Sequence, residues 1–560
     1  MVDEGPDGRS RFDAWATRVR AAVARVDPCD DPTAEPLSLL AVLALSIACA
    51  FSAWMFLRWK YQPMQDLGHH MALAAVVADY DRPGSLYHRL YEPLDRLAAN
   101  SLLYSLAGPI GRLVGVTRAV RGCVVFYLVG VPFANLFALR TFGRSAWGAL
   151  LAVPLVYGMS YVAGFANLLF AAPFMVLALP LFHRMLERPS APRVALASAA
   201  VLVVFLSHAH AWLWTGALLF LLTLFVAAQR LFAHRPFASR ARGALVVGGA
   251  ALAAVLPSLV LFARWYRRTF GEGQHEGTVL NATGNWSNKF GATFKPLPEL
   301  FTNLSSFALK TTQSDHDLKL VVSLGLLVGA AVVFGRAHRW RKPPVMEAAF
   351  ALTFLSYFFL PEGLQGHDVL GSRQIGISLW FLPAIASPIP ARASRLAHAL
   401  VALGIVYVTG AALRDWRDAL VRFEQTEAHG LDEVMLAAPP GLRLHYVKSD
   451  PDSAVFTWRP FWHVEKMYMS ERLGYVADTP GILSTSAIRY RPGLELHRVT
   501  DHGAGWVRDD EIWSSFDLIL LRRWTPSASS LREAERRGER IKKVGDWELW
   551  RSKQAKPAAW

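Results

Sequence analysis

Three titratable residues lie close together in the stretch RWKYQPMQDLGHHMALAAVVADY, which follows the first long apolar run. If Pro63 lies in the first turn of a helix, His69 and His70 follow Asp66 by three and four residues, so all three share one face. The carboxylate can then accept a proton from an attacking hydroxyl, or it can join the imidazoles in holding a divalent cation such as Mg²⁺ or Mn²⁺ beside a phosphate. A purely structural alternative is that the three cap a juxtamembrane helix and pair with headgroups or arginines.

Further polar groups follow in two other stretches that are predicted to face the same side. His208 and His210 lie in the SHAHAW turn, His367 lies in PEGLQGHDVLGSR, and Arg373 ends that stretch. Ionisable groups at membrane depth are costly and usually functional, and a guanidinium can bind a phosphate through two parallel hydrogen bonds. The competing explanations are a solvated turn for the histidines and interfacial snorkelling for the arginine. We predict that these four residues contact substrate, together with His69 and His70.

The composition indicates an integral membrane protein. Hydrophobic residues make up 53% of the 560 residues and charged residues only 18%, with 19 Trp and 32 Phe. That apolar surplus exceeds what one soluble core can bury. The formal net charge of +15 comes from short basic clusters between apolar runs, without a basic stripe or a nucleic-acid motif, so no nucleic acid is expected as a partner. Three cysteines without metal-binding spacing predict no disulfide framework.

Apolar runs of about 20 residues, the length that crosses a bilayer, predict eleven transmembrane helices. Two stretches are too long for one span and must each fold back as a hairpin of two. The other seven are single spans. The hairpins are 146–183 and 194–229, and the single spans are 37–57, 119–139, 243–263, 318–335, 345–361, 374–391 and 396–413.

Arginine and lysine clusters set the direction of these spans. Consecutive clusters bracket an even number of spans, and basic loops stay in the cytoplasm. Residues 1–36 are therefore predicted to be cytoplasmic, and the first span is predicted to be a retained anchor rather than a cleaved signal peptide. An odd total places the C-terminus outside. We expect a multi-pass protein of the cell inner (plasma) membrane, in contact with membrane lipids.

The predicted domains follow from this topology. The transmembrane domain spans 37–413, with outer loops 58–118, 264–317 and 361–373, and the polar tail 414–560 is predicted to be a small extracytoplasmic α/β domain. The tail has strand patterns at LRLHYV, FDLILL and WELWRS, and helical patterns at 461–475 and 528–541. Trp462 and His463 in the first of these helical patterns can reach back over Asp66, although the aromatic core of the tail is the favoured interpretation.

Taken together, the whole architecture resembles the GT-C superfamily of membrane glycosyltransferases, which includes the protein O-mannosyltransferases and the aminoarabinose transferases of lipid A. The shared features are the inside N-terminus, the acid soon after the first span, about eleven spans, the late arginine and the outward tail. The resemblance implies that Asp66 is the catalytic base or a metal ligand and that the donor is a sugar on a polyprenyl phosphate, transferred on the outer face. Many members carry two adjacent acids in the first loop, whereas here leucine follows Asp66 and the next acids are Asp79 and Asp81.

Two other classes of function remain open at this stage. A transporter or flippase for a lipid-linked or polar solute would place its polar groups near the bilayer midplane and would show related halves. A non-catalytic scaffold that binds partners through its tail would give Asp66 no functional role. The gathering of ionisable residues at the outer edge favours the transferase, with an acceptor that the sequence does not identify.

Overall fold

The structure is a computed structural model. It describes residues 38–232, 236–270, 294–308, 311–314, 316–335, 344–362, 370–385, 395–448, 450–477, 479, 486–491 and 507–557. His367 lies outside the described residues, so its predicted contact with substrate stays a prediction.

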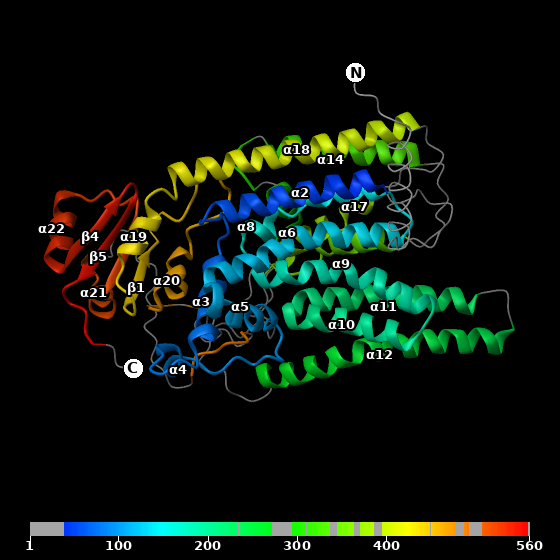
Figure 1. Cartoon of the computed structure of the whole chain (residues 1–560), viewed down its shortest axis with the longest axis horizontal. Helices are drawn as coiled ribbons and strands as arrows, with labels where there is room; N and C mark the ends of the chain where they lie inside the picture. The colour runs from blue at the N-terminus through cyan, green and yellow to red at the C-terminus, as the bar shows by residue number, and fades with distance from the viewer. Residues whose placement is uncertain are drawn as a thin grey trace, which may run out of the picture.

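A bundle of roughly aligned helices makes up most of the chain (Figure 1). Its long helices are α2 (Leu39–Arg58), α6 (Val116–Thr141), α9 (Ala166–Glu187), α10 (Ala191–Ser207), α11 (Ala209–Leu231), α12 (Phe237–Phe270), α14 (His316–Gly335) and α18 (Arg395–Thr426). Shorter helical pieces are η1 (Ala146–Leu151), α7 (Ala152–Leu155), α8 (Met159–Val162), α13 (Leu297–Ala308), α15 (Val345–Ser356), α16 (Leu370–Leu379) and α17 (Leu382–Ile385).

Six helices among the described residues are long and apolar enough to cross a membrane: α2, α6, α9, α11, α12 and α18. Of the other predicted spans, 318–335 coincides with the 20-residue helix α14, which is not among these six, and the rest coincide with shorter or broken helices. The first half of the 146–183 hairpin is three short pieces around Gly158 and Gly164, and the predicted span 374–391 overlaps α16 and α17. The helical membrane fold is therefore confirmed, while the count of eleven spans stays a prediction.

The first outer segment contains α3 (Leu67–Asp79), α4 (Leu86–Leu90) and α5 (Leu102–Val114). The helix of the DLGHH motif begins at Leu67, so the predicted first turn at Pro63 is wrong, and Asp66 is the residue that precedes the helix. α5 leaves Leu106, Ile110 and Leu113 exposed, which suits a helix at a membrane surface.

The tail contains a five-stranded sheet in the order β2-β1-β3-β5-β4. Its strands are β1 (Arg443–Val447), β2 (Tyr475–Val476), β3 (Leu518–Arg522), β4 (Gly538–Val544) and β5 (Trp547–Ser552), and its helices are α19 (Leu431–Ala437), α20 (Met467–Arg472), α21 (Asp510–Ser515) and α22 (Ala528–Arg537), with the 3₁₀ turn η3 (Val464–Lys466). β1 is parallel to β2 and β3, whereas β5 is antiparallel to β3 and β4. The three predicted strands are confirmed, but the helix predicted over 528–541 ends at Arg537, because β4 starts at Gly538.

The tail lies against the first outer segment at one end of the bundle, as Figure 1 shows. Tyr91 forms an isolated antiparallel bridge with Tyr490 of the tail, and Thr312 forms another with Phe456. α18 continues past residue 414, the predicted start of the tail, and leads directly into it. The described parts of the predicted outer loops and the tail therefore meet at one end of the bundle, where Asp66 also lies.

Candidate functional site

The backbone of Asp66 is held by the turn between α8 and α9. The Gln65 amide donates to the Val162 carbonyl at 2.9 Å, and the Asp66 amide donates to Ala163 at 3.1 Å. Gly164 makes this contact possible, because its φ of +77° is costly for other residues and an added Cβ would lie 2.6 Å from the Asp66 nitrogen. The turn therefore fixes the Asp66 backbone without using its side chain, which forms no capping hydrogen bond with α3.

The tail closes over the other side of α3. A Cβ added at Gly68 would lie 2.2 Å from the carbonyl oxygen of His463, so only glycine lets the two backbones approach this closely. His463 directly precedes η3, and its side chain is buried. Gly164 and Gly68 thus allow the α8–α9 turn, the start of α3 and the tail to meet around Asp66.

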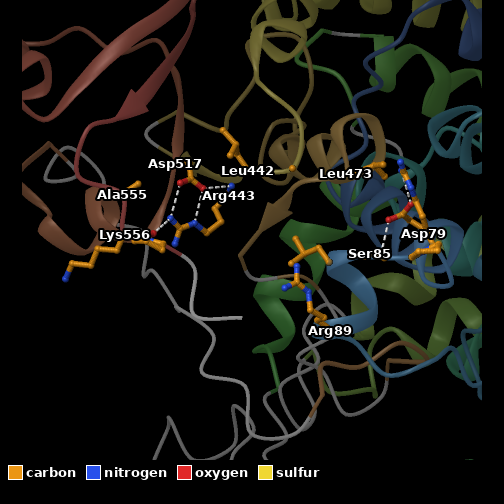
Figure 2. A pocket seen from close by; sticks show the side chains of 15 residues that line it. Asp79, Ser85, Arg89, Leu442, Arg443, Leu473, Asp517, Ala555 and Lys556 are labelled. Atoms are coloured by element: carbon orange, nitrogen blue, oxygen red, sulfur yellow. Dashed lines mark hydrogen bonds and ion pairs between the residues drawn. The ribbon is translucent and has the colours of Figure 1, made fainter.

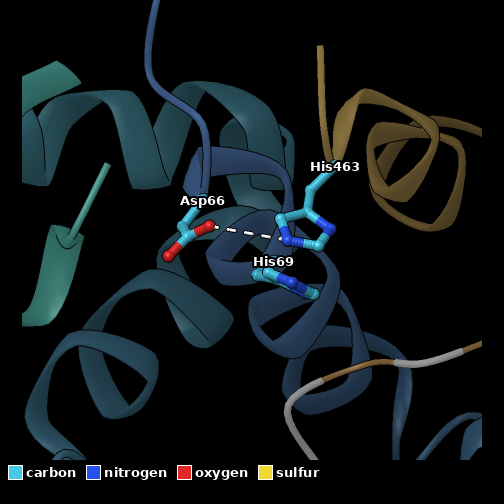
Figure 3. A group of neighbouring side chains, drawn as sticks. All are labelled: Asp66, His69 and His463. Carbon is cyan, nitrogen blue, oxygen red and sulfur yellow. Dashed lines mark ion pairs between the residues drawn. The ribbon is translucent and has the colours of Figure 1, made fainter. Parts of the chain in front are cut away.

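Asp66, His69 and His463 form one compact group, which Figure 3 shows from close by. The His463 Nε2 atom lies 3.6 Å from the Asp66 Oδ1 atom, and the ring centres of His69 and His463 are 3.7 Å apart. One potential ligand atom from each of the three lies within 4.8 Å of the others. We refer to these three residues as the Asp66 triad.

Burial changes the proton affinity of the triad. It raises the pKa of Asp66 from 3.8 to about 7, against the opposing effect of the Arg373 and Lys466 charges and a hydrogen bond with Gln65. Burial also holds the pKa of His69 and of His463 well below the usual range, and the positive charge of Lys466 adds to both shifts. The Asp66 side chain remains 25% exposed, so a substrate can still reach it. At neutral pH the triad therefore combines a carboxyl group that can take up a proton with two neutral imidazoles.

The triad fits a divalent cation. The buried Nδ1 atoms of His69 and His463 find no hydrogen-bond partner among the described residues, which is a costly state that a ligand would relieve. Two neutral imidazoles and one carboxylate suit Mn²⁺ or Zn²⁺ better than Mg²⁺, which prefers oxygen ligands alone. Three protein ligands also leave coordination positions open for a substrate oxygen.

His70 faces another neighbour. Its Nδ1 atom lies 2.9 Å from the Tyr104 hydroxyl of α5, and Asn167 donates to the same hydroxyl at 3.3 Å. Burial lowers the pKa of His70 from 6.5 to about 4. The structure groups Asp66 and His69 with His463, and the predicted set of Asp66, His69 and His70 stays a prediction.

Arg373, in the first turns of α16, lies close enough for its charge to lower the pKa of Asp66. Its guanidinium stacks 4.3 Å from the centre of the Phe165 ring, next to the turn that holds Asp66. The neighbouring Gln374 amide contacts the His210 ring nitrogen at 2.5 Å. The first-loop acid and the late arginine therefore lie in the same region of the structure, while their predicted roles stay predictions.

His208 caps the following helix. It precedes α11, and its Nδ1 atom accepts a hydrogen bond from the Ala211 amide at 3.3 Å. The next residue, Ala209, donates its amide to the Asn100 side chain of the first outer segment. The hydrogen bond of His208 therefore stabilises the turn between α10 and α11. The predicted contact of His208 with substrate stays a prediction.

Solved structures similar to this chain include ArnT, a protein crystallised with and without its lipid ligand. The crystal structure of ArnT from Cupriavidus metallidurans bound to undecaprenyl phosphate superposes with a TM-score of 0.53 at 12% sequence identity, covering 92% of this chain and 99% of that one. The chain has the fold of ArnT. The apo structure of the same ArnT matches with a TM-score of 0.43 and 13% identity over the same shares, too low to add an argument. No family model and no curated protein sequence matches the chain.

Within this ArnT fold, the residue that sequence reasoning undervalued is His463. Its signal was the pair Trp462-His463 at the start of an expected helix, but the aromatic core of the tail was the favoured interpretation. Lys466 was missed altogether: it is buried, donates to the Ala477 carbonyl at 2.7 Å and pairs with Glu465 at 3.2 Å. A buried charge of this kind leaves no periodic signature in the sequence.

Proposed function

We propose that the protein is a membrane glycosyltransferase that moves a sugar from a polyprenyl phosphate donor to an acceptor on the outer face of the membrane. The observation that carries the proposal is the gathering of Asp66, His69, His463 and Arg373 at one end of an ArnT-like helical bundle. The ArnT that shares this fold is bound to undecaprenyl phosphate, which supports a donor of the same chemical class.

In this reaction the acceptor hydroxyl attacks the anomeric carbon of the donor sugar. The bond from that carbon to the phosphate oxygen breaks, and polyprenyl phosphate leaves with the electron pair. Asp66 accepts the proton of the attacking hydroxyl, a role that suits a carboxyl group whose pKa is about 7. Arg373, stacked on Phe165, binds the phosphate and stabilises the charge that it gains.

Asp66, His69 and His463 are the residues that would hold a divalent cation, if one takes part. Such a cation would supply Lewis-acid stabilisation of the phosphate. Without it, His463 orients the Asp66 carboxylate from 3.6 Å, and both imidazoles are neutral groups that can hydrogen-bond to the sugar or the acceptor. Chelation separates these two cases, because it abolishes transfer only in the first.

Lipid extracts test the proposal. Cells lacking the protein should accumulate a polyprenyl-linked sugar, and wild-type protein should clear it, whereas Asp66→Asn should not, since an amide cannot accept the proton. Asp81→Asn is a matched control, because Asp81 lies in the same outer loop but is exposed and pairs with Arg112. Mass spectrometry of the lipids, with the amount of inserted protein measured in parallel, gives the readout.

Two outcomes would contradict the proposal. Clearance of the lipid by Asp66→Asn at the wild-type rate excludes Asp66 as the base. A defect in solute uptake without any accumulated lipid-linked sugar favours the transporter instead.

A further inference from the structure

A cleft of about 680 Å³ lies between the first outer segment and the tail (Figure 2). One wall comes from Asp79, residues 82–86 and Arg89, and the other from 441–443, Asp517 and 555–557. Asp79 is the last residue of α3, whereas Asp66 precedes the first, so the 1.5 Å rise per residue separates the cleft from the triad by about 20 Å. The cleft is therefore a second site, joined to the first by one rigid helix.

The first wall is built around the Asp79 carboxylate. The Ser85 hydroxyl donates to Asp79 Oδ2 at 3.0 Å, and Arg82 lies 3.6 Å from Oδ1. The same Ser85 oxygen caps α4 by accepting from the Tyr87 amide. These bonds fix the orientation of the wall, while the mostly exposed Arg82 side chain still has donors for a ligand.

The second wall is built around a bidentate ion pair. Arg443 donates to both oxygens of Asp517, at 2.9 and 3.0 Å, and to the Lys556 carbonyl at 2.5 Å. Burial raises the pKa of Asp517, but the bonds from Arg443 outweigh it and leave that pKa below the ordinary value. Because the pair is rigid and its charges cancel, this wall offers oriented hydrogen-bonding groups with little net charge.

Apolar surfaces lie among these polar groups. Leu442 and Leu473 line the cleft, together with Arg89 of α4, which Figure 2 labels. A saccharide matches this lining, since its hydroxyls both donate and accept hydrogen bonds and its ring faces are apolar. The volume falls within the roughly 300–1,000 Å³ range of small-molecule sites and can hold more than a single sugar ring.

We propose that this cleft binds a saccharide chain. The inference rests on the proposed function, in which the bound chain is the acceptor and its end extends along α3 to Asp66. A docking site about 20 Å from the reacting hydroxyl selects acceptors of several sugar units over single sugars.

Direct binding tests the cleft without relying on transfer. The purified full chain in detergent is applied to an array of neutral and acidic oligosaccharides of two to eight units. We expect a subset to bind, and we expect that binding to weaken at least tenfold in Arg89→Ala, which removes donors, and in Leu442→Trp, which fills the cleft. Arg532→Ala is the matched control, because Arg532 is an exposed arginine of α22 that does not line the cleft.

The outcomes separate this inference from the proposed function. Asp66→Asn should bind the array as the wild type does, since the base lies at the other end of α3. Binding that persists in both cleft variants, or no binding to any saccharide, overturns the inference while the lipid-extract test still stands. If the cleft binds saccharide but the protein clears no lipid-linked sugar, the saccharide site is supported and the proposed transferase activity is contradicted.

Discussion

Gly68→Ala should inactivate the protein through a methyl group that touches no substrate. The added Cβ would lie 2.2 Å from the His463 carbonyl oxygen, about 1 Å inside ordinary contact, and the obstacle is backbone that cannot rotate away. The segment that carries His463 must therefore move away from α3, and the 3.6 Å approach of its ring to Asp66 is lost. A misplacement of about 1 Å in a catalytic group costs roughly 10²-fold in rate, or about 2.7 kcal/mol of transition-state stabilisation.

The assay is sugar transfer by the purified variant from the lipid that accumulates in cells lacking the protein. Gly122→Ala and Gly216→Ala are matched controls, because they lie in α6 and α11 and an added Cβ meets nothing within 4 Å. Overpacking at Gly68 costs about 1–3 kcal/mol of stability, so thermal unfolding is followed in parallel. If Gly68→Ala fails to fold, His463→Gln tests the same contact without the clash.

A folded Gly68→Ala protein with wild-type transfer would refute the reasoning, since it would show that the position of His463 does not matter. Loss of transfer in the two control variants as well would show that the assay reports general damage to the helices.

Three further predictions concern the charge, the pH dependence and the topology. Arg373→Ala should raise the donor KM more than the acceptor KM and Arg373→Lys should restore it only in part, because an ammonium lacks the paired contact; equal donor saturation curves would exclude the phosphate role. In cation-free protein, the transfer rate should rise with pH through about 7 and level off above it, because only the ionised Asp66 accepts a proton; a rate that is flat between pH 5 and 8 would remove Asp66 as the titrating base. A cysteine at the exposed Ser529, in a background without Cys29, Cys49 and Cys123, should react with an impermeant thiol reagent in intact cells; labelling only after the membrane is opened would place the tail inside.

Local rules account for the parts of the fold that could be predicted. The apolar runs that became α2, α6 and α12 are recognisable because burying about 20 residues in lipid needs a continuous apolar stretch. The strands β1, β3 and β5 are recognisable because their hydrophobic, β-branched and aromatic residues are typical of a buried sheet. The turns at Gly158 and Gly164 lie where the 146–183 stretch was expected to fold back. The sequence did not predict that its first half would be the short pieces η1, α7 and α8 rather than one span, or that the turn at Gly164 would contact Asp66.

The sequence by itself determined that Asp66 and His69 lie near each other, because residues three apart meet at a helix end whatever the rest of the chain does. The same rule predicted His70 beside them, and tertiary packing added a partner for its ring, because its Nδ1 atom lies 2.9 Å from the Tyr104 hydroxyl. Only the tertiary structure brought His463 to Asp66, from the far end of the chain. The contact between His463 and Asp66 depends on the close backbone approach at Gly68. Helical periodicity relates only residues that are near neighbours in the chain, so it carries no information about that contact.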